Sequence, residues 1–206
     1  MKPLRPGAAA ALLVPILFLS ALAVAQAPGK KPGRDTPNAP AVRQETAARA
    51  APDIEAEMAA LPYRVGDRAG FRPVGVAGES ASFTDESSGA GAQATITLAP
   101  SPQFRSLPQV PNVQRDQILR QLALNDPGLT DAVIETLGAI QTGEILRYEV
   151  IARGKAAGSG QETIRMVAVL FSGGTPLSVV ATAPESRQDD ILPRLRSFVR
   201  SISRRP

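Results

Sequence analysis

Three successive stretches in the second half of the chain have the residue patterns of β-strands. Residues 146–153 alternate apolar with mostly charged side chains, residues 164–171 are almost continuously apolar, and residues 177–183 form a third apolar run. Gly-containing segments at 154–160 and 172–174 separate the three runs. Period-two alternation is typical of a half-buried strand, and short loops join antiparallel neighbours. The pattern therefore predicts an antiparallel meander with a flexible hairpin loop at 154–160.

Shorter strands are predicted earlier in the chain. Residues 71–76 and 81–84 have β-forming compositions and are linked by a turn at Gly78, and residues 92–98 alternate Ala, Ile and Leu with Gln and Thr. The segment 87–91 is rich in Ser and Gly, which is typical of a turn. These segments extend the predicted sheet toward the N-terminus.

Two later segments are less regular. The prolines between residues 100 and 111 predict irregular structure there. Residues 132–141 are compatible with a helix or a strand. We favour a strand because Gly138 and Gly143 bracket residues 139–142, and a hairpin into residues 146–153 follows naturally.

Two helices are expected before the meander. Asp53 is a suitable N-cap for a short helix that reaches Leu61. A second helix is predicted from Asn112, with an apolar stripe formed by Ile118, Leu119 and Leu122, and the Asn-Asp-Pro-Gly sequence at 125–128 ends it.

The closing helix has the clearest pattern in the chain. Its apolar side chains recur at helical spacing, at Ile191, Leu195, Phe198 and Ile202. Asp189 or Asp190 is the expected N-cap, and Pro193 falls in the first turn, where a missing amide donor does little harm. Strands, a helix, further strands and a closing helix define an α+β fold. We expect one domain over residues 53–206, an antiparallel β-sheet flanked by helices.

The first residues have the features of a secretory signal peptide. Lys2 and Arg5 precede an apolar run over 8–23, and the small residues of Ala23-Val24-Ala25 suit signal peptidase, so we expect cleavage between Ala25 and Gln26. An uncleaved membrane anchor is the alternative. Cleavage is favoured because Pro15 interrupts the run and polar, Pro-rich sequence follows it. The predicted location is periplasmic or secreted.

A Pro- and Ala-rich linker is predicted between the leader and the domain. Residues 26–52 contain five prolines and no apolar periodicity, which is typical of a disordered segment. It is either a spacer or an unselected tail. The linker holds five basic and two acidic side chains, whereas residues 53–206 hold 16 basic and 17 acidic ones, a net charge of −1. The domain is therefore not a general binder of nucleic acid or other polyanions.

Composition limits the chemistry of the domain. The sequence has no Cys, His or Trp. It therefore has no thiolate or histidine-activated nucleophile and no ordinary zinc, copper or haem site. The Gly78–Ser82 segment differs at one position from the G-x-S-x-G motif of a nucleophile elbow, because Ser82 stands where the motif has its second glycine. Carboxylates near one another in sequence do not face each other, although a pair formed in space stays open. No catalytic residue, cofactor or metal is expected.

Two clusters of charge are candidate binding sites. Glu79, Asp85 and Glu86 could hold calcium, but a solvated acidic loop is the favoured interpretation. Arginines on the closing helix form a stripe opposite its apolar face, at Arg196, Arg200 and Arg204, continued by Arg205. The stripe could contact an acidic partner, anionic lipid or lipopolysaccharide, but an ordinary solvated face is the favoured interpretation.

The chain resembles the Mog1/PsbP-like superfamily over roughly residues 60–206. The likeness lies in the order of elements, the Tyr63-Arg64-Val65 entry, the loop at 154–160 and the closing Phe198-Val199-Arg200-Ser201-Ile202. The resemblance implies an antiparallel sheet sandwiched by helices. It also implies a non-catalytic accessory or binding role, because known members attach to larger assemblies, and it supplies no catalytic residues.

Three functions follow from these observations. The favoured hypothesis is a non-enzymatic exported binding or accessory protein with an envelope protein as its partner. The second is a carrier or sensor of a small apolar ligand held between the sheet and a helix. The third is a carboxylate-dependent enzyme, which requires two acidic residues that converge in a cleft.

Overall fold

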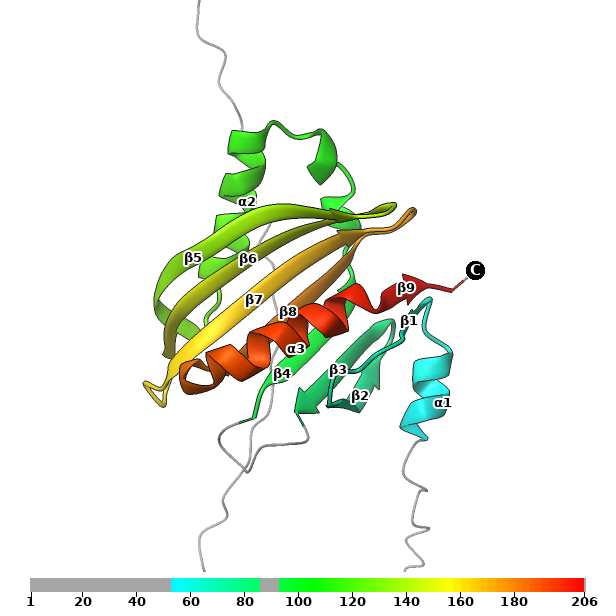
Figure 1. The fold of residues 1–206 in the computed structure, drawn as a ribbon, viewed down its shortest axis with the longest axis horizontal. Helices are drawn as coiled ribbons and strands as arrows, with labels where there is room; N and C mark the ends of the chain where they lie inside the picture. The colour runs from blue at the N-terminus through cyan, green and yellow to red at the C-terminus, as the bar shows by residue number, and fades with distance from the viewer. Residues whose placement is uncertain (1–52, 86–92, 206) are drawn as a thin grey trace, which may run out of the picture. The chain divides into compact units, whose positions relative to one another are not determined.

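The computed structural model of the protein describes residues 53–85 and 93–205 (Figure 1). The predicted leader (1–25), the predicted linker (26–52) and the Ser- and Gly-rich segment around Glu86 lie outside the described residues. The described part contains an antiparallel sheet of seven strands in the order β2-β3-β4-β8-β7-β6-β5 and a two-stranded sheet of β1 and β9. Helices flank the larger sheet, so the predicted α+β fold is confirmed.

The bounds of the elements are as follows. The strands are β1 (Tyr63–Val65), β2 (Phe71–Ala77), β3 (Ser80–Asp85), β4 (Thr95–Pro100), β5 (Leu129–Thr142), β6 (Ile145–Ala156), β7 (Glu162–Phe171), β8 (Leu177–Pro184) and β9 (Ile202–Arg204). The helices are α1 (Ile54–Ala59), α2 (Asn112–Leu124) and α3 (Gln188–Arg200). Short 3-10 turns span Pro102–Phe104, Leu107–Gln109 and Glu185–Arg187.

Most predicted elements are present where the sequence patterns place them. The Asp53 carboxylate caps α1 by accepting from the backbone N–H of Glu55 at 3.1 Å and of Ala56 at 3.4 Å. β6, β7 and β8 pair antiparallel in sequence order, which confirms the meander. The ambiguous segment 132–141 belongs to β5, which pairs along its length with β6.

Helices pack on both faces of the large sheet. α3 crosses one face (Figure 1), where Phe198 meets Phe71 and Phe83 edge to face, with ring centroids 5.8 and 4.9 Å apart. On the opposite face, Leu119 of α2 packs in a second cluster with Tyr148 of β6. Side chains of β6 therefore alternate between the two layers, with odd-numbered residues on the α3 face.

The start of α3 differs from the prediction. The helix begins at Gln188, and its N-cap residue Arg187 makes no side-chain capping bond. Asp190 lies inside the first turn and accepts a hydrogen bond from Arg187 at 2.7 Å, so the predicted aspartate cap is wrong. The 3-10 turn at Glu185–Arg187 leads directly into α3, so the helix begins nearer the N-terminus than predicted. Pro193 consequently lies in the helix interior rather than in the first turn.

The end of α3 also differs. The helix stops at Arg200, and Ile202 belongs to β9, where it pairs with Val65 of β1. The apolar side chain of Ile202 is buried as predicted, but a strand places it in the core. Helical periodicity does not reveal this change, because the pairing with β1 joins residues far apart in sequence.

The predicted hairpin loop at 154–160 is shorter than expected. β6 continues to Ala156, so Gly154 is a strand residue. A Cβ atom at Gly154 would lie 2.7 Å from the carbonyl oxygen of Thr130 on β5. This position needs glycine because β5 and β6 approach closely here, next to an irregularity in their register. Loop flexibility is not the reason.

Candidate functional site

Charged side chains interrupt the apolar face of the sheet beneath α3. On β6, Arg147 and Glu149 share this face with the buried Ile151. The side chains of Arg147 and Glu149 are each only 5% exposed. Burial of a charge is unfavourable unless a partner compensates it. This pair is therefore a feature of the α3 face that the packing of apolar side chains does not explain.

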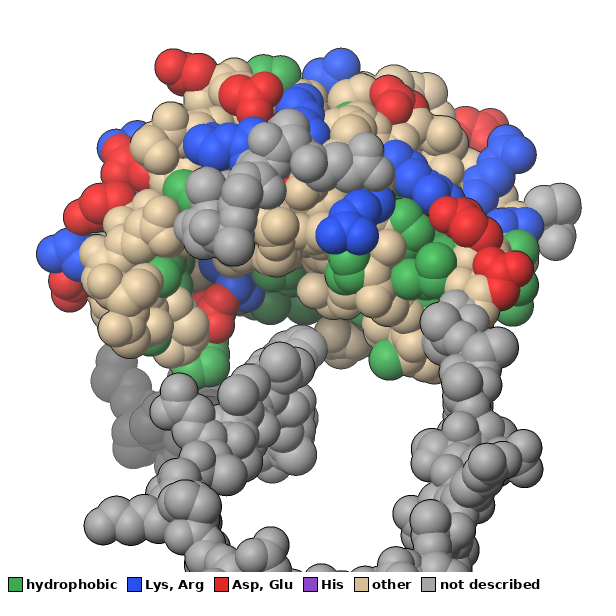
Figure 2. Space-filling model, turned by 90° about the horizontal axis from the view of Figure 1, so that it is seen from below, with side chains coloured by type: hydrophobic (Ala, Val, Ile, Leu, Met, Phe, Trp, Pro, Cys, Tyr) green, Lys and Arg blue, Asp and Glu red, His purple; other side chains and the backbone are tan. Residues whose placement is uncertain are grey.

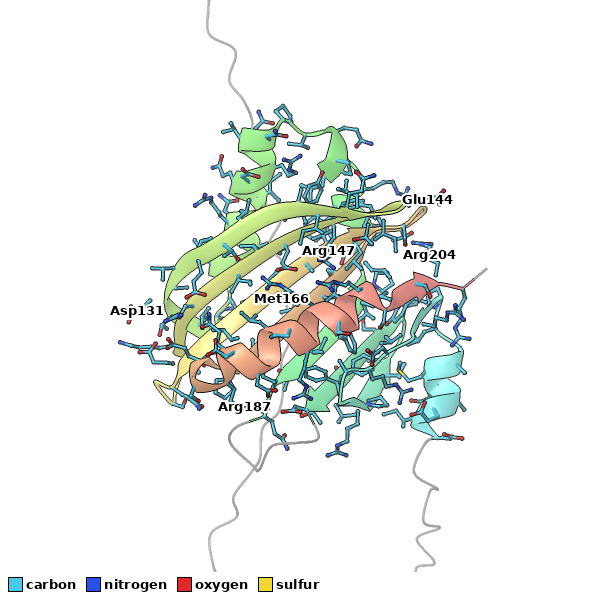
Figure 3. All side chains as sticks on the ribbon, in the orientation of Figure 1. Asp131, Glu144, Arg147, Met166, Arg187 and Arg204 are labelled. Atoms are coloured by element: carbon cyan, nitrogen blue, oxygen red, sulfur yellow. The ribbon has the colours of Figure 1, made fainter. Side chains whose placement is uncertain are left out.

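Glu149 lies between guanidinium groups from the sheet and from the helix. Its Oε1 accepts a hydrogen bond from Nε of Arg196 on α3 at 3.0 Å. Its Oε2 lies 3.6 Å from Nε of Arg147, which is an ion pair without a hydrogen bond. Figure 3 shows Arg147 on the face of the sheet that α3 crosses. A carboxylate thus links β6 to α3.

The cluster carries more positive than negative charge. Burial is the main cause that lowers the pKa of the Arg147 guanidinium, and the charges of Arg200 and Arg196 lower it further, while Glu149 acts in the opposite direction. Three arginines therefore act electrostatically on one another around one carboxylate, a surplus of two positive charges. Arg147 remains protonated at neutral pH because an arginine starts from a very high pKa.

Arg147 also borders a small cavity between α3 and the end of the β5–β6 hairpin. The cavity has a volume of about 30 Å³ and is lined by Ile140, Thr142, Ile145, Arg147, Leu170, Val199 and Arg200. Among the described residues, none accepts a hydrogen bond from Nε of Arg147. We call the surface formed by Ile140, Arg147, Arg196, Val199 and Arg200 the arginine groove. Its chemistry, three guanidinium groups beside aliphatic side chains, suits an anion attached to an apolar body.

The four arginines of the predicted stripe do not lie on one helix. Arg196 and Arg200 are on α3, whereas Arg204 is in β9 and donates to the carbonyl of Thr175. Arg205 follows β9 and donates to the carbonyl of Tyr63 at 3.3 Å. The structure thus brings Arg196 and Arg200 together with Arg147 and places Arg204 and Arg205 in contacts with backbone.

Arg147 and Glu149 are site residues that the sequence pattern did not identify. Their alternation with Leu146, Tyr148 and Val150 is equally typical of a strand with a solvated polar face. One signal was present, since Ile151 has the same parity as Arg147 and Glu149 and is apolar. An apolar residue on the charged face indicates that this face is partly covered.

Of the three acidic residues considered for calcium, Glu86 lies outside the described residues, and for Asp85 at the end of β3 the favoured interpretation of a solvated loop is wrong. Asp85 is fully buried and forms ion pairs with Arg187 and, at 2.7 Å, with Arg194. Arg194 in turn stacks over the ring of Phe71. These contacts attach the end of β3 to α3. Within 53–85 and 93–205, no group of His, Cys, Asp or Glu side chains is arranged to hold a metal ion.

Some charged residues outside the groove form ion pairs between elements. Arg153 of β6 pairs with Glu135 of β5 at 2.5 Å and also with Glu185, and Arg165 of β7 pairs with Asp126. On the face seen in Figure 2, Lys and Arg side chains are interspersed with Asp and Glu. This agrees with the near-neutral charge of the domain and leaves the arginine groove as the candidate site.

The fold is that of the Mog1/PsbP-like proteins. PsbP (CyanoP) from Synechocystis sp. PCC 6803 superposes with a TM-score of 0.51 and 15% identity, over 70% of this chain and 87% of that one. The Ran-binding protein Mog1p from Saccharomyces cerevisiae gives 0.49 and 12%, over 69% and 89%. LpqN, involved in cell envelope biogenesis of Mycobacterium tuberculosis, gives 0.47 and 11%, over 70% and 83%.

These similarities are confined to structure. No protein-family model and no curated protein matches the sequence. At identities this low the similarity establishes the fold alone, and it carries no residue of a relative's site onto this chain. None of the helices within the described residues is long and apolar enough to cross a membrane.

Proposed function

We propose that this chain is an exported, non-enzymatic accessory protein of the cell envelope that binds a protein partner through the arginine groove. The observation that carries the proposal is the cluster in which the buried Arg147 lies with Arg196 and Arg200 around the carboxylate of Glu149, a surplus of two positive charges. Such a cluster is unfavourable in the isolated domain and favourable when an anionic group binds.

The composition and the N-terminal sequence support the same proposal. The signal-peptide features of residues 1–25 favour export, and the absence of His and Cys removes the thiolate nucleophile and the histidine base that usually activates a serine. Glu149, which lies beside the groove, is held by Arg196, and its ionic partners among the described residues are arginines. A glycosidase-type mechanism needs two carboxyl groups that face one substrate.

A ligand carrier is the less suitable alternative. Pockets for small molecules are generally ~300 Å³ or larger and enclose most of the ligand. The cavity that borders the arginine groove has about 30 Å³, which suits a single side chain. A pocket of about 320 Å³ beside Asp126 and Leu129 opens to solvent at the surface. A charged contact with another protein that places one side chain in this cavity fits the arginine groove better.

The test is partner retrieval from intact cells. The C-terminally tagged chain is crosslinked in cells and purified beside Arg200→Glu and the matched control Arg120→Glu, which reverses the charge of an exposed arginine on α2. We expect one dominant envelope protein with the wild type and the control, and its loss with Arg200→Glu. The same retained proteins in all three samples, or background alone, would contradict the proposal. A mature N-terminus at Gln26 tests export, and an intact Met1 would overturn it.

A further inference from the structure

The outer edge of β5 is available for pairing with another strand. β5 lies at one end of the large sheet and has a neighbour, β6, on one side only. From Thr136 to Thr142 its register with β6 is unbroken, and no residue in this stretch is charged or proline. Residues 138–142 are all exposed. An edge strand presents a row of unpaired backbone N–H and C=O groups to solvent.

The opposite edge of the same sheet is protected. β2 contains Pro73, which lacks a backbone donor, and its register with β3 shifts between Pro73 and Gly75. Proline and local irregularities are the usual devices that prevent edge pairing. The two edges therefore differ in their ability to accept a strand, although each exposes an aliphatic side chain, Val74 on β2 and Ile140 on β5.

The open edge is continuous with the arginine groove. Ile140 pairs with Arg147 across the β5–β6 ladder, so both side chains lie on the α3 face. A strand added beside β5 would place every second side chain on this same face, next to Ile140 and toward the cavity that Arg147 and Arg200 line. Backbone hydrogen bonds would supply affinity, and the side chain that enters the groove would supply selectivity.

The charge of the arginine cluster and the volume of the cavity together indicate which side chain enters the groove. The cluster has two surplus positive charges, and two of its arginines, Arg147 and Arg200, line the cavity. A cavity needs ~10–15 Å³ for each water molecule, so about 30 Å³ accommodates the two oxygens of a carboxylate. We propose, building on the function proposed above, that an extended acidic segment of the partner adds to β5 at residues 136–142 and inserts an Asp or Glu carboxylate between Arg147 and Arg200.

The proposal is tested with two synthetic peptides and NMR. Each blocked peptide has six residues that alternate Val with polar residues, with Glu at the central polar position in one and Gln in the other. We expect the Glu peptide to shift the backbone amide signals of residues 136–142 and the Nε–H signal of Arg147. The Gln peptide should bind roughly tenfold to a hundredfold more weakly, the effect of replacing a charged hydrogen-bond partner by a neutral one.

Two exposed positions provide matched variants. Ile140→Glu places a carboxylate of the chain itself at the groove and should remove the preference for the Glu peptide. Val74→Glu makes the same change at the protected edge and should leave the preference intact. Both side chains are at least a third exposed, 37% for Ile140 and 49% for Val74, so both variants are expected to fold.

The inference would be overturned by equal affinity for the two peptides, or by no shift of the backbone amide signals of residues 136–142. It would also be overturned if anionic phosphatidylglycerol vesicles bound through Arg147 and the Glu peptide did not bind. The in vitro test is independent of the partner retrieved from cells. If Arg200→Glu loses that partner but no peptide adds to β5, the proposed function stands and strand addition does not. If the peptide binds but no partner is retained, strand addition stands and the accessory role does not.

Discussion

Arg147 and Glu149 are expected to contribute very unequally to stability, although they form one buried pair. The perturbation Glu149→Gln keeps the shape of the side chain and removes its charge. Arg147, only 5% exposed, would then lie near Arg196 and Arg200 without a compensating carboxylate. Removing one member of a buried ion pair costs about 3–5 kcal/mol. We expect Glu149→Gln to lower the free energy of unfolding by about that amount.

Arg147→Met should cost far less. At 3.6 Å and an effective dielectric constant of about 20, the attraction between Arg147 and Glu149 is about 4–5 kcal/mol. Burial of the guanidinium costs several kcal/mol, and repulsion from Arg196 and Arg200 adds to that cost. Because Glu149 keeps its hydrogen bond from Arg196, these terms nearly cancel. The free energy of unfolding should therefore stay within about 1 kcal/mol of wild type.

Urea denaturation followed by circular dichroism measures both changes. Arg120→Met, which removes an exposed arginine on α2, serves as the matched control and should have no measurable effect. A loss for Arg147→Met as large as that for Glu149→Gln would refute the reasoning, because Arg147 would then be a structural residue. A loss below about 1 kcal/mol for Glu149→Gln would show that the carboxylate does not neutralise the cluster.

Three further predictions concern the rest of the domain. Asp85→Asn should lower the free energy of unfolding by about 3–5 kcal/mol in urea denaturation, because it leaves Arg187 and Arg194 without their buried partner. Gly154→Ala should cost about 1–3 kcal/mol in the same assay, because its methyl group would overlap the backbone of β5; an unchanged midpoint would contradict the close approach. Burial raises the pKa of Tyr63 to about 12 in the folded protein, so the unfolded chain ionises first and stability should fall as the pH rises from about 10 to 12. Tyr63→Phe should flatten that part of the stability–pH curve, and an unaltered slope would argue against it.

The order of helices and strands could be predicted from the sequence because it depends on local patterns of apolar and polar residues. The alternation in residues 146–153 and the spacing of Ile191, Leu195 and Phe198 correspond to β6 and α3. The boundary of α3 was not accessible. Its C-terminal end is set by the pairing of Val65 with Ile202, and a neighbouring pair in this ladder, Arg64 and Ser203, is 139 residues apart in sequence.

The candidate site depended on contacts that no local pattern contains. Arg196 and Arg200 were recognised as a cationic face of a helix, for which an ordinary solvated face was the favoured interpretation. Their significance depends on Arg147 and Glu149, which lie on a strand about fifty residues earlier. Charged residues on one face of a strand are typical of solvent exposure, so their burial under α3 becomes visible only once the layers are assembled.

The central claim is that a protein partner occupies the arginine groove in the cell envelope. The most direct measurement places a photoreactive amino acid at position 140, with position 74 on the protected edge as the control, and identifies crosslinked proteins in intact cells by mass spectrometry. We predict one envelope protein that crosslinks from position 140, not from position 74, and that is lost when Arg147→Met is added. The same crosslinks from both positions, or a yield that Arg147→Met leaves unchanged, would contradict the claim.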